Sequence, residues 1–238
     1  MAETRPAPDP AALRAALEAV PLFRDLGGDD LDALAGELRP RRYRRGESIF
    51  RQGDPGDGLH VLLAGRVKIS TVSDAGAEAI LATLRPPEFF GSLAILDGAA
   101  RSASATAIEA TETVILSHDR FRRLVDESPA IRDHVFRELA RELRRLTRHV
   151  EELHFLDIAG RLAARLASLS REQGAPAADG SIRLAGPLSQ GELAAMVGST
   201  RQSVNKLLGQ LVDDGLIRLD RDAIVVLDPA GLERSARR

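Results

Sequence analysis

The sequence predicts an α+β chain that contains an N-terminal β-roll, a long central helix and a C-terminal winged helix-turn-helix. Short β-rich runs separated by glycine turns extend from Arg41 to about Leu116, a pattern typical of a small roll or barrel. An apolar stripe with helical spacing follows Pro129. Two amphipathic helix patterns, joined at Gly198, then precede a hairpin pattern near the C-terminus.

The N-terminal part divides into a tail with a short helix, residues 1–20, and a β-rich domain, residues 21–128. The first ten or so residues are rich in proline and alanine, which favours disorder, and a helical pattern completes the first segment. Runs of β-branched and aliphatic residues between glycine turns predict the strands of the second segment. The expected strands comprise residues 48–50, 59–63, 67–72, 79–84 and 112–116.

The helix that follows, assigned to residues 129–157, carries a narrow apolar stripe. Pro129 suits the first turn of a helix because its missing N–H needs no partner there. The stripe has spacings of three and four residues, close to the heptad seam of a two-stranded coiled coil. We therefore expect a homodimer through this helix, with packing on its own β-roll as the alternative. The expected interface residues are Val135, Leu139, Leu143, Leu146, Val150 and Leu153.

The two helix patterns near the C-terminus have recognisable start and stop signals. Ser189 and Glu192 have the spacing of a capping box, which predicts that the first helix begins there. Gly198 is expected to end this helix, and Ser199 or Thr200 can cap the next one. The side chains expected to face inward are Leu193, Met196 and Val197 in the first helix, and Val204, Leu207, Leu208 and Leu211 in the second.

The second of these helices presents polar side chains on the face opposite its apolar stripe. Arginine and lysine suit guanine in the major groove of DNA, and glutamine and asparagine suit adenine. Residues 217–219 and 223–227 read as a hairpin wing, which would complete a DNA-binding domain over residues 158–238. We therefore expect binding to double-stranded DNA through Gln190, Ser199, Thr200, Arg201, Gln202, Ser203, Asn205 and Lys206.

Composition argues against several other classes of protein. The chain has 238 residues, no cysteine and a net charge of −2. The absence of cysteine excludes disulfides, thiolate zinc sites and cysteine-ligated iron–sulfur clusters, and we expect no metal site. No apolar run reaches the length of a membrane span and no signal-peptide pattern is present, so we expect a cytoplasmic protein without a membrane partner. No arrangement of nucleophile and base, paired carboxylates or metal ligands indicates an enzyme.

Three motifs in the order seen here resemble those of the catabolite-activator (CRP)/FNR family of bacterial transcription regulators. They are the β-roll with the segment GSLAILDGAARSA at residues 91–103, the long helix ending in FLDIAGRL at residues 155–162, and the winged helix. The resemblance spans nearly the whole chain from about Pro21. It implies that the β-roll is a cyclic-nucleotide-binding-type sensor, that the long helix forms the dimer, and that a homodimer binds a palindromic operator and contacts RNA polymerase.

The effector pocket implied by this resemblance departs from the cAMP-binding pattern. Arg101 and Ser102 offer a charged fork and a hydroxyl, which suit a phosphate. By the resemblance, cAMP-binding members have a glutamate where this chain has Ser92, and two hydroxyl residues where it has Leu146 and Thr147. We therefore expect weak cAMP binding. The expected pocket residues are Gly91, Ser92, Leu93, Arg101, Ser102, Ala103, Leu146 and Thr147.

The effector stays open among a weakly bound cyclic nucleotide, another small anionic molecule, and none at all. Residues 89–93 and 198–201 are also similar to the nitrogen-control branch that senses 2-oxoglutarate, although Glu142 and Thr147 replace the ligand-binding pair of that branch. Without an effector, the dimer would be constitutively competent to bind DNA. A protein-interaction module without DNA binding is the alternative class.

The expected recognition helix also departs from the family pattern, in which Arg-Glu-Thr-Val is followed by Gly or Ser and then Arg. Arg201 is kept as the expected guanine reader. Gln202 replaces a glutamate that accepts from cytosine, which shifts the expected preference toward adenine. Lys206 keeps the charge of the family arginine but loses its bidentate fork. We therefore predict a palindromic operator related to that of the family, with altered identity near Gln202.

Overall fold

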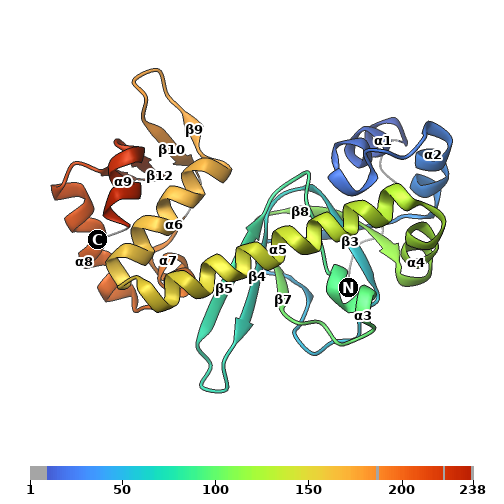
Figure 1. The fold of residues 1–238 in the computed structure, drawn as a ribbon, viewed down its shortest axis with the longest axis horizontal. Helices are drawn as coiled ribbons and strands as arrows, with labels where there is room; N and C mark the ends of the chain where they lie inside the picture. Colours follow the sequence, from blue (N-terminus) through green and yellow to red (C-terminus); the bar gives the residue numbers. More distant parts are fainter. Residues whose placement is uncertain (1–9, 186–187, 222, 237–238) are drawn as a thin grey trace. The chain divides into compact units, whose positions relative to one another are not determined.

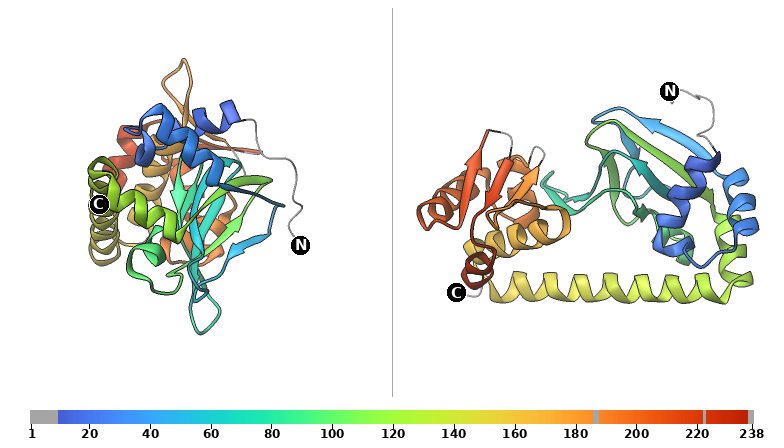
Figure 2. Two further views of the ribbon diagram at one scale, coloured as in Figure 1. Left: turned by 90° about the vertical axis from the view of Figure 1, so that its right-hand side faces the viewer. Right: turned by 90° about the horizontal axis from the view of Figure 1, so that it is seen from above.

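The computed structural model describes residues 10–185, 188–221 and 223–236 and divides into two compact units, Met1–Glu142 and Leu143–Arg238. Helix α5, Pro129–Phe155, begins at the predicted proline and contributes to both units; Figure 2 shows it as one continuous helix. The prediction of a disordered tail falls on residues that lie outside the described ranges.

The β-roll of the first unit consists of two four-stranded antiparallel sheets (Figure 1). The strand order is β1-β8-β3-β6 in one sheet and β2-β7-β4-β5 in the other. The strands are β1 (Arg39–Tyr43), β2 (Ser48–Phe50), β3 (Gly58–Ala64), β4 (Val67–Val72), β5 (Glu78–Leu84), β6 (Phe89–Phe90), β7 (Ser104–Ala107) and β8 (Thr111–Ser117).

The five predicted strands are confirmed as β2, β3, β4, β5 and β8, each within a residue or two of the expected bounds. Strands β1, β6 and β7 were not predicted from the sequence. The sequence of β1 is Arg-Pro-Arg-Arg-Tyr, which lacks the apolar alternation of a half-buried strand. Its strand conformation comes from antiparallel pairing with β8, in which Arg39 lies opposite Ile115 and Tyr43 lies opposite Thr111. Tertiary pairing has overridden local preference here.

Strand β3 contributes side chains to two cores because successive residues of a strand point to opposite faces. Leu59 and Val61 belong to the larger apolar cluster, which also includes the helices of this unit. Leu62 belongs to a smaller cluster with Phe90, and the ring of His60 stacks on Phe90 on the same side. Strand β3 is therefore buried on both faces.

The helices of the first unit pack on the sheet that contains β3. They are α1 (Pro10–Ala19), the 3₁₀ turn η1 (Pro21–Phe23), α2 (Gly28–Glu37), α3 (Ser92–Asp97) and α4 (His118–Glu127). Phe23, Leu34, Phe121 and Ile131 lie together in the larger apolar cluster, each almost fully buried. Because Ile131 is on α5, the first turns of α5 are part of this core.

The second unit is a helix-turn-helix domain with a four-stranded antiparallel sheet of order β11-β12-β10-β9. Its elements are α6 (Ile158–Gln173), β9 (Ala175–Pro176), β10 (Ile182–Ala185), α7 (Gln190–Val197), α8 (Arg201–Asp213), β11 (Ile217–Asp220), β12 (Ala223–Val226) and α9 (Pro229–Ser235). Helix α6 packs against α7, α8 and α9.

The predicted hairpin wing is confirmed, since β11 and β12 pair with Ile217 opposite Val226. One residue of its expected turn, Asp222, lies outside the described ranges. Sequence analysis missed β10, which pairs with the other edge of β12 and places Ile182 opposite Val226. The hairpin is therefore anchored in a larger sheet, and all four residues of β12 are buried.

Candidate functional site

Helices α7 and α8 begin at the predicted capping residues. Ser189 and Glu192 form the expected capping box: the Ser189 N–H donates to Glu192 Oε2 at 2.8 Å, and the Glu192 N–H donates to Ser189 Oγ at 3.1 Å. Gly198 ends α7 in the left-handed conformation. Of the two candidates for the second cap, the structure uses Thr200, whose Oγ1 accepts from the Ser203 N–H at 3.1 Å.

The inward face of this helix pair is buried as predicted. Leu193, Met196 and Val197 of α7 are buried, and so are Val204, Leu208 and Leu211 of α8. Leu207 is only half-buried, at the border between the two faces of α8. These apolar contacts hold α8 by one side and leave its other side open to solvent.

The outward face of α8 carries the side chains expected to contact DNA. Arg201, Gln202, Asn205 and Lys206 are all exposed, whereas Ser203 and Ser199 are half-buried and Thr200 is used as the cap. Gln190, the first residue of α7, lies beside this face and contacts two of its residues. Its Nε2 donates to Asn205 Oδ1 at 2.7 Å, and its Oε1 accepts from Arg201 Nε at 3.5 Å. The structure therefore brings Gln190, Arg201 and Asn205 into one polar group.

The expected dimer stripe on α5 is divided between two environments. Val135 is 7 % exposed and Leu139 packs on the same apolar cluster of its own subunit, so the prediction that Val135 faces a partner is wrong. The reason is that α5 starts inside the core of the first unit. Phe136, which was not among the predicted interface residues, is 62 % exposed and stands seven positions before Leu143. Such heptad spacing was the signal that could have identified it.

The remaining stripe residues are exposed along one side of α5: Leu143 is 66 %, Leu146 46 %, Val150 61 % and Leu153 47 % exposed. Exposed apolar side chains at heptad spacing are typical of a helix that pairs with another helix. In the described ranges no helix, α5 included, is both long and apolar enough to span a membrane.

In the β-roll, Arg101 lies beside Gly91, and both are among the predicted pocket residues. The Arg101 side chain is 1 % exposed, and its Nη1 donates to the Gly91 carbonyl at 2.7 Å. Its Nη2 donates to the Gly58 carbonyl at 2.8 Å and to Asp57 Oδ1 at 2.6 Å. Gly91 has a φ of 83° and precedes α3, and a side chain there would collide with the Arg101 guanidinium.

An aromatic cluster, which sequence analysis missed, surrounds this arginine. The Arg101 guanidinium carbon lies 4.1 Å from the centre of the Phe50 ring, a cation–π contact. The His60 ring stacks on Phe90 with 5.1 Å between centres and is tilted toward Phe50 at 5.5 Å. His60 is 2 % exposed, and among the described residues neither of its ring nitrogens has a hydrogen-bond partner.

Asp57 carries the negative charge that faces Arg101 and His60. Its Oδ1 is 3.9 Å from His60 Nε2, which is too long for a hydrogen bond, and it attracts that imidazole when the ring is protonated. His60 and Arg101 together hold the pKa of the Asp57 carboxyl well below its usual range. Burial lowers the pKa of His60, since a charged imidazole is disfavoured away from water. The Asp57 carboxylate therefore balances the positive charge of Arg101 within the protein.

The other predicted pocket residues are less closely grouped. Ala103 is buried, Ser92 is half-buried, and Leu93 and Ser102 are exposed. Leu146 and Thr147 are exposed on α5, and the Thr147 hydroxyl donates to the Leu143 carbonyl at 3.0 Å. Both belong to the second unit, so their part in the pocket stays a prediction.

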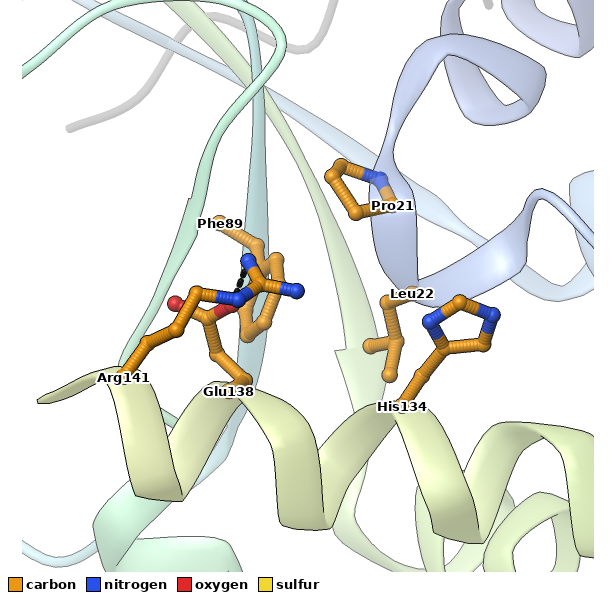
Figure 3. Close-up of a pocket in the computed structure, with 6 residues that line it drawn as sticks. All are labelled: Pro21, Leu22, Phe89, His134, Glu138 and Arg141. Carbon is orange, nitrogen blue, oxygen red and sulfur yellow. Dashed lines mark hydrogen bonds and ion pairs between the residues drawn. The ribbon is translucent and has the colours of Figure 1, made fainter.

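Another pocket lies between η1, β6 and α5 (Figure 3) and shares no lining residue with the Arg101 group. Its lining includes Glu138 and Arg141, whose side chains form an ion pair at 2.6 Å. It also includes His134, whose Nε2 lies 2.7 Å from Asp25 Oδ2. The Asp25 contact ties α5 to the segment after η1, which is a structural role.

Comparison with known proteins assigns both units. Residues 40–128 match the family described as the cyclic nucleotide-binding domain, and residues 160–235 match the Crp-like helix-turn-helix domain. The fold of the β-roll and of the second unit agrees with these two descriptions.

Relatives match over nearly the whole chain. A CRP-like cAMP-activated global transcriptional regulator of Mycobacterium tuberculosis is 34 % identical over 91 % of this chain and 96 % of its own length. A cyclic AMP receptor protein of Thermus thermophilus gives the same identity and coverage. The structure of a CRP/FNR-family transcriptional regulator from Thermus thermophilus superposes with a TM-score of 0.68 at 28 % identity, over 84 % of this chain and 99 % of that one. The chain therefore belongs to the CRP/FNR family of transcription regulators.

Proposed function

We propose that this regulator acts in the cytoplasm as a homodimer on a palindromic operator and controls transcription together with RNA polymerase. The single observation that carries the proposal is the outward face of α8. Arg201, Gln202, Asn205 and Lys206 are exposed on it while the opposite face is buried. Side chains near the N-terminus of a recognition helix are those that reach base edges in the major groove.

A selection of operators from random duplex DNA by the full-length protein tests this function. We expect a palindrome, with a guanine that is read by Arg201 and a base near Gln202 that differs from the usual family choice. Arg201→Ala should lose the preference for that guanine, at a cost of about 1–3 kcal/mol. A wild-type protein that selects no sequence would refute the function and would favour a protein-interaction module.

The exposed heptad positions of α5 support the homodimer. Phe136, Leu143 and Val150 recur every seven residues, and all three are more than half exposed. Such positions gain stability by packing against a second copy of the helix. We expect Val150→Asp to dissociate the dimer in analytical ultracentrifugation, whereas Val72→Asp, at a similarly exposed valine on β4, should not. A wild-type protein that is monomeric at micromolar concentration would contradict the proposal.

The effector pocket is proposed to be altered relative to that of cAMP-activated relatives. The names of the relatives from Mycobacterium tuberculosis and Thermus thermophilus refer to cAMP. This chain has Ser92 where cAMP-binding members of the family are expected to have a glutamate, so the charge of that glutamate is missing. In addition, Arg101 already pairs with Asp57. The loss of one charged hydrogen bond to a ligand costs about 1.5–3 kcal/mol, or about one to two powers of ten in affinity.

Titration of cAMP during measurement of operator affinity tests this part of the proposal. We expect no large gain in affinity at micromolar cAMP. A hundredfold gain would show that the pocket is a functional cAMP site.

The Asp57–Arg101 pair also favours a second candidate, a regulator that binds its operator without an effector, since the charge of the pocket arginine is balanced without a ligand. High operator affinity of protein stripped of small molecules would support that candidate.

A further inference from the structure

The polar group formed by Gln190, Arg201 and Asn205 has a defined hydrogen-bond direction. Arginine can only donate, so the Gln190 oxygen must face Arg201 Nε, which lies 3.5 Å away. The Gln190 amide nitrogen then faces Asn205 and donates to its Oδ1 at 2.7 Å. The 2.7 Å bond is the stronger of the two contacts, since 3.5 Å is long for a hydrogen bond. The direction of this chain of bonds thus follows from the chemistry of the guanidinium.

The backbone on both sides of this contact is firmly held. Gln190 is the first residue of α7 and follows the capping box at Ser189, and Arg201 is the first residue of α8 and follows the cap at Thr200. Arg201 and Asn205 are four residues apart on α8 and therefore share one face of that helix. Gln190 reaches this face from a different helix, so the contact constrains both side chains across the turn between α7 and α8.

This arrangement limits what each side chain can offer to a base. Asn205 Oδ1 is engaged, which leaves the Nδ2 donors as the part of the amide that can meet DNA. Bidentate recognition of adenine by asparagine needs both the oxygen and the nitrogen, and turning the amide to present both breaks the Gln190 bond. Arg201 Nε is directed at Gln190, which leaves its two terminal nitrogens for the paired acceptors of guanine.

We propose that Gln190 is a positioning residue that sets base specificity: it makes Asn205 a donor-only reader that favours acceptors of guanine or thymine over adenine, and it orients Arg201 end-on toward guanine. This inference rests on the proposed function, because it requires that α8 enters the major groove. It also revises the expectation from sequence that an outward asparagine suits adenine.

The experiment compares base preferences of full-length wild type, Gln190→Ala and Gln190→Glu in operator selections, with affinities then measured for each base at the affected position. The base read by Asn205 is the one whose preference changes in Asn205→Ala. Gln190→Ala frees the Asn205 oxygen, so the preference for adenine over guanine at that base should rise by at least about fivefold. The preference of Arg201 for guanine should weaken severalfold, with the affinity for non-specific duplex DNA unchanged because no phosphate contact is lost.

Gln190→Glu reverses the direction of the bond to Asn205. A carboxylate can only accept, so Asn205 must donate its Nδ2 and turn its oxygen outward. The preference at that base should then move to adenine or cytosine, the bases that carry amino donors in the major groove. Gln210→Ala is the matched control. Gln210 is an exposed amide in the later turns of α8, and its replacement should leave every base preference unchanged.

Two results would overturn the inference. One is a set of base preferences that neither Gln190 variant alters. The other is a uniform loss of affinity for all sequences in Gln190→Ala, which would make Gln190 a phosphate contact. Both presuppose that wild type selects a palindrome and that Arg201→Ala loses the preference for its guanine, so they are distinct from failure of the proposed function. The double variant of Gln190→Ala and Asn205→Ala should lose the adenine preference that Gln190→Ala alone gains. This result would support the inference that Gln190 acts through Asn205.

Discussion

Replacement of Asp57 by asparagine tests the charge balance inside the β-roll. Arg101 is 1 % exposed, and its Nη2 donates to Asp57 Oδ1 at 2.6 Å. A hydrogen bond between charged groups contributes about 1.5–3 kcal/mol, but Asp57 is 66 % exposed and solvent screens part of this energy. Arg101 also keeps its bonds to the carbonyls of Gly58 and Gly91. We therefore expect Asp57→Asn to lower the free energy of unfolding of the first unit by about 1–2 kcal/mol.

The size of this loss should depend on pH. His60 and Arg101 lower the pKa of Asp57 below its ordinary value of 3.8, so the folded protein keeps the carboxylate charged where the unfolded chain protonates it. A lowered carboxyl pKa stabilises the fold fully above the unfolded pKa, and this stabilisation is lost as the pH falls toward the folded pKa. The difference between wild type and Asp57→Asn should therefore be largest at neutral pH and shrink steadily below pH 3.8.

The single tyrosine of the chain provides the assay. Tyr43 lies on β1 in the first unit, and the sequence contains no tryptophan, so tyrosine fluorescence follows the unfolding of that unit alone. Urea unfolding of the full-length protein at several pH values gives the free energies to be compared. The signal is independent of events in the helix-turn-helix unit.

The control is Glu112→Gln, which removes a carboxylate from a surface pair. Glu112 lies 2.7 Å from Arg42, with the two side chains 41 % and 45 % exposed, so the expected loss is below about 0.5 kcal/mol. Equal losses in the two variants would mean that burial of Arg101 does not strengthen its pair with Asp57. A loss in Asp57→Asn that does not shrink in acid would contradict the reasoning as well.

Three further changes test other parts of the structure. Thr200→Ala removes the cap of α8 and should cost about 1 kcal/mol, seen as faster hydrogen exchange of the α8 amides. Gly91→Ala places a methyl group at positive φ against Arg101 and should lower the stability of the first unit by about 1–3 kcal/mol, measured by tyrosine fluorescence. Val135→Ala should lower it by about 2 kcal/mol because Val135 is buried in its own subunit, whereas Val150→Ala should weaken only self-association in sedimentation.

Each of these changes has an opposing outcome. Unchanged exchange of α8 amides in Thr200→Ala would mean that the cap is replaced by solvent at no cost. A Gly91→Ala protein of wild-type stability would show that the turn tolerates a side chain and that Arg101 can move. If Val135→Ala and Val150→Ala both weakened the dimer without loss of subunit stability, the corrected assignment of Val135 would be wrong.

The helix-turn-helix could be predicted from sequence because its determinants are local. Ser189 and Glu192 are three residues apart, as are Thr200 and Ser203, and each pair forms hydrogen bonds within one helical turn. The burial of Val204 likewise follows from helical spacing. Such contacts form in nearly any tertiary setting, so their residue types are readable before the fold is known.

The pairing of the Arg101 charge with Asp57 could not be predicted from such local patterns. Asp57 lies 44 positions before Arg101 in the chain, and the two meet only because the residue preceding β3 and the segment after α3 are brought together by the roll. The position of His60 between Phe50 and Phe90 depends on the same packing. Arg101 was predicted from the sequence as a pocket residue, but its counterion was not.

The residue pattern was enough to predict that α5 is a long helix with one apolar stripe and that α8 turns polar side chains outward, because periodicity alone specifies which residues share a face. What each part of the α5 stripe faces depends instead on the packing of the folded chain. Val135 is covered by the core of its own subunit, whereas Phe136 and the residues from Leu143 onward remain exposed. Spacings of three and four residues suit both a buried helix face and a coiled-coil seam, so the choice between them depends on which other elements pack against the helix.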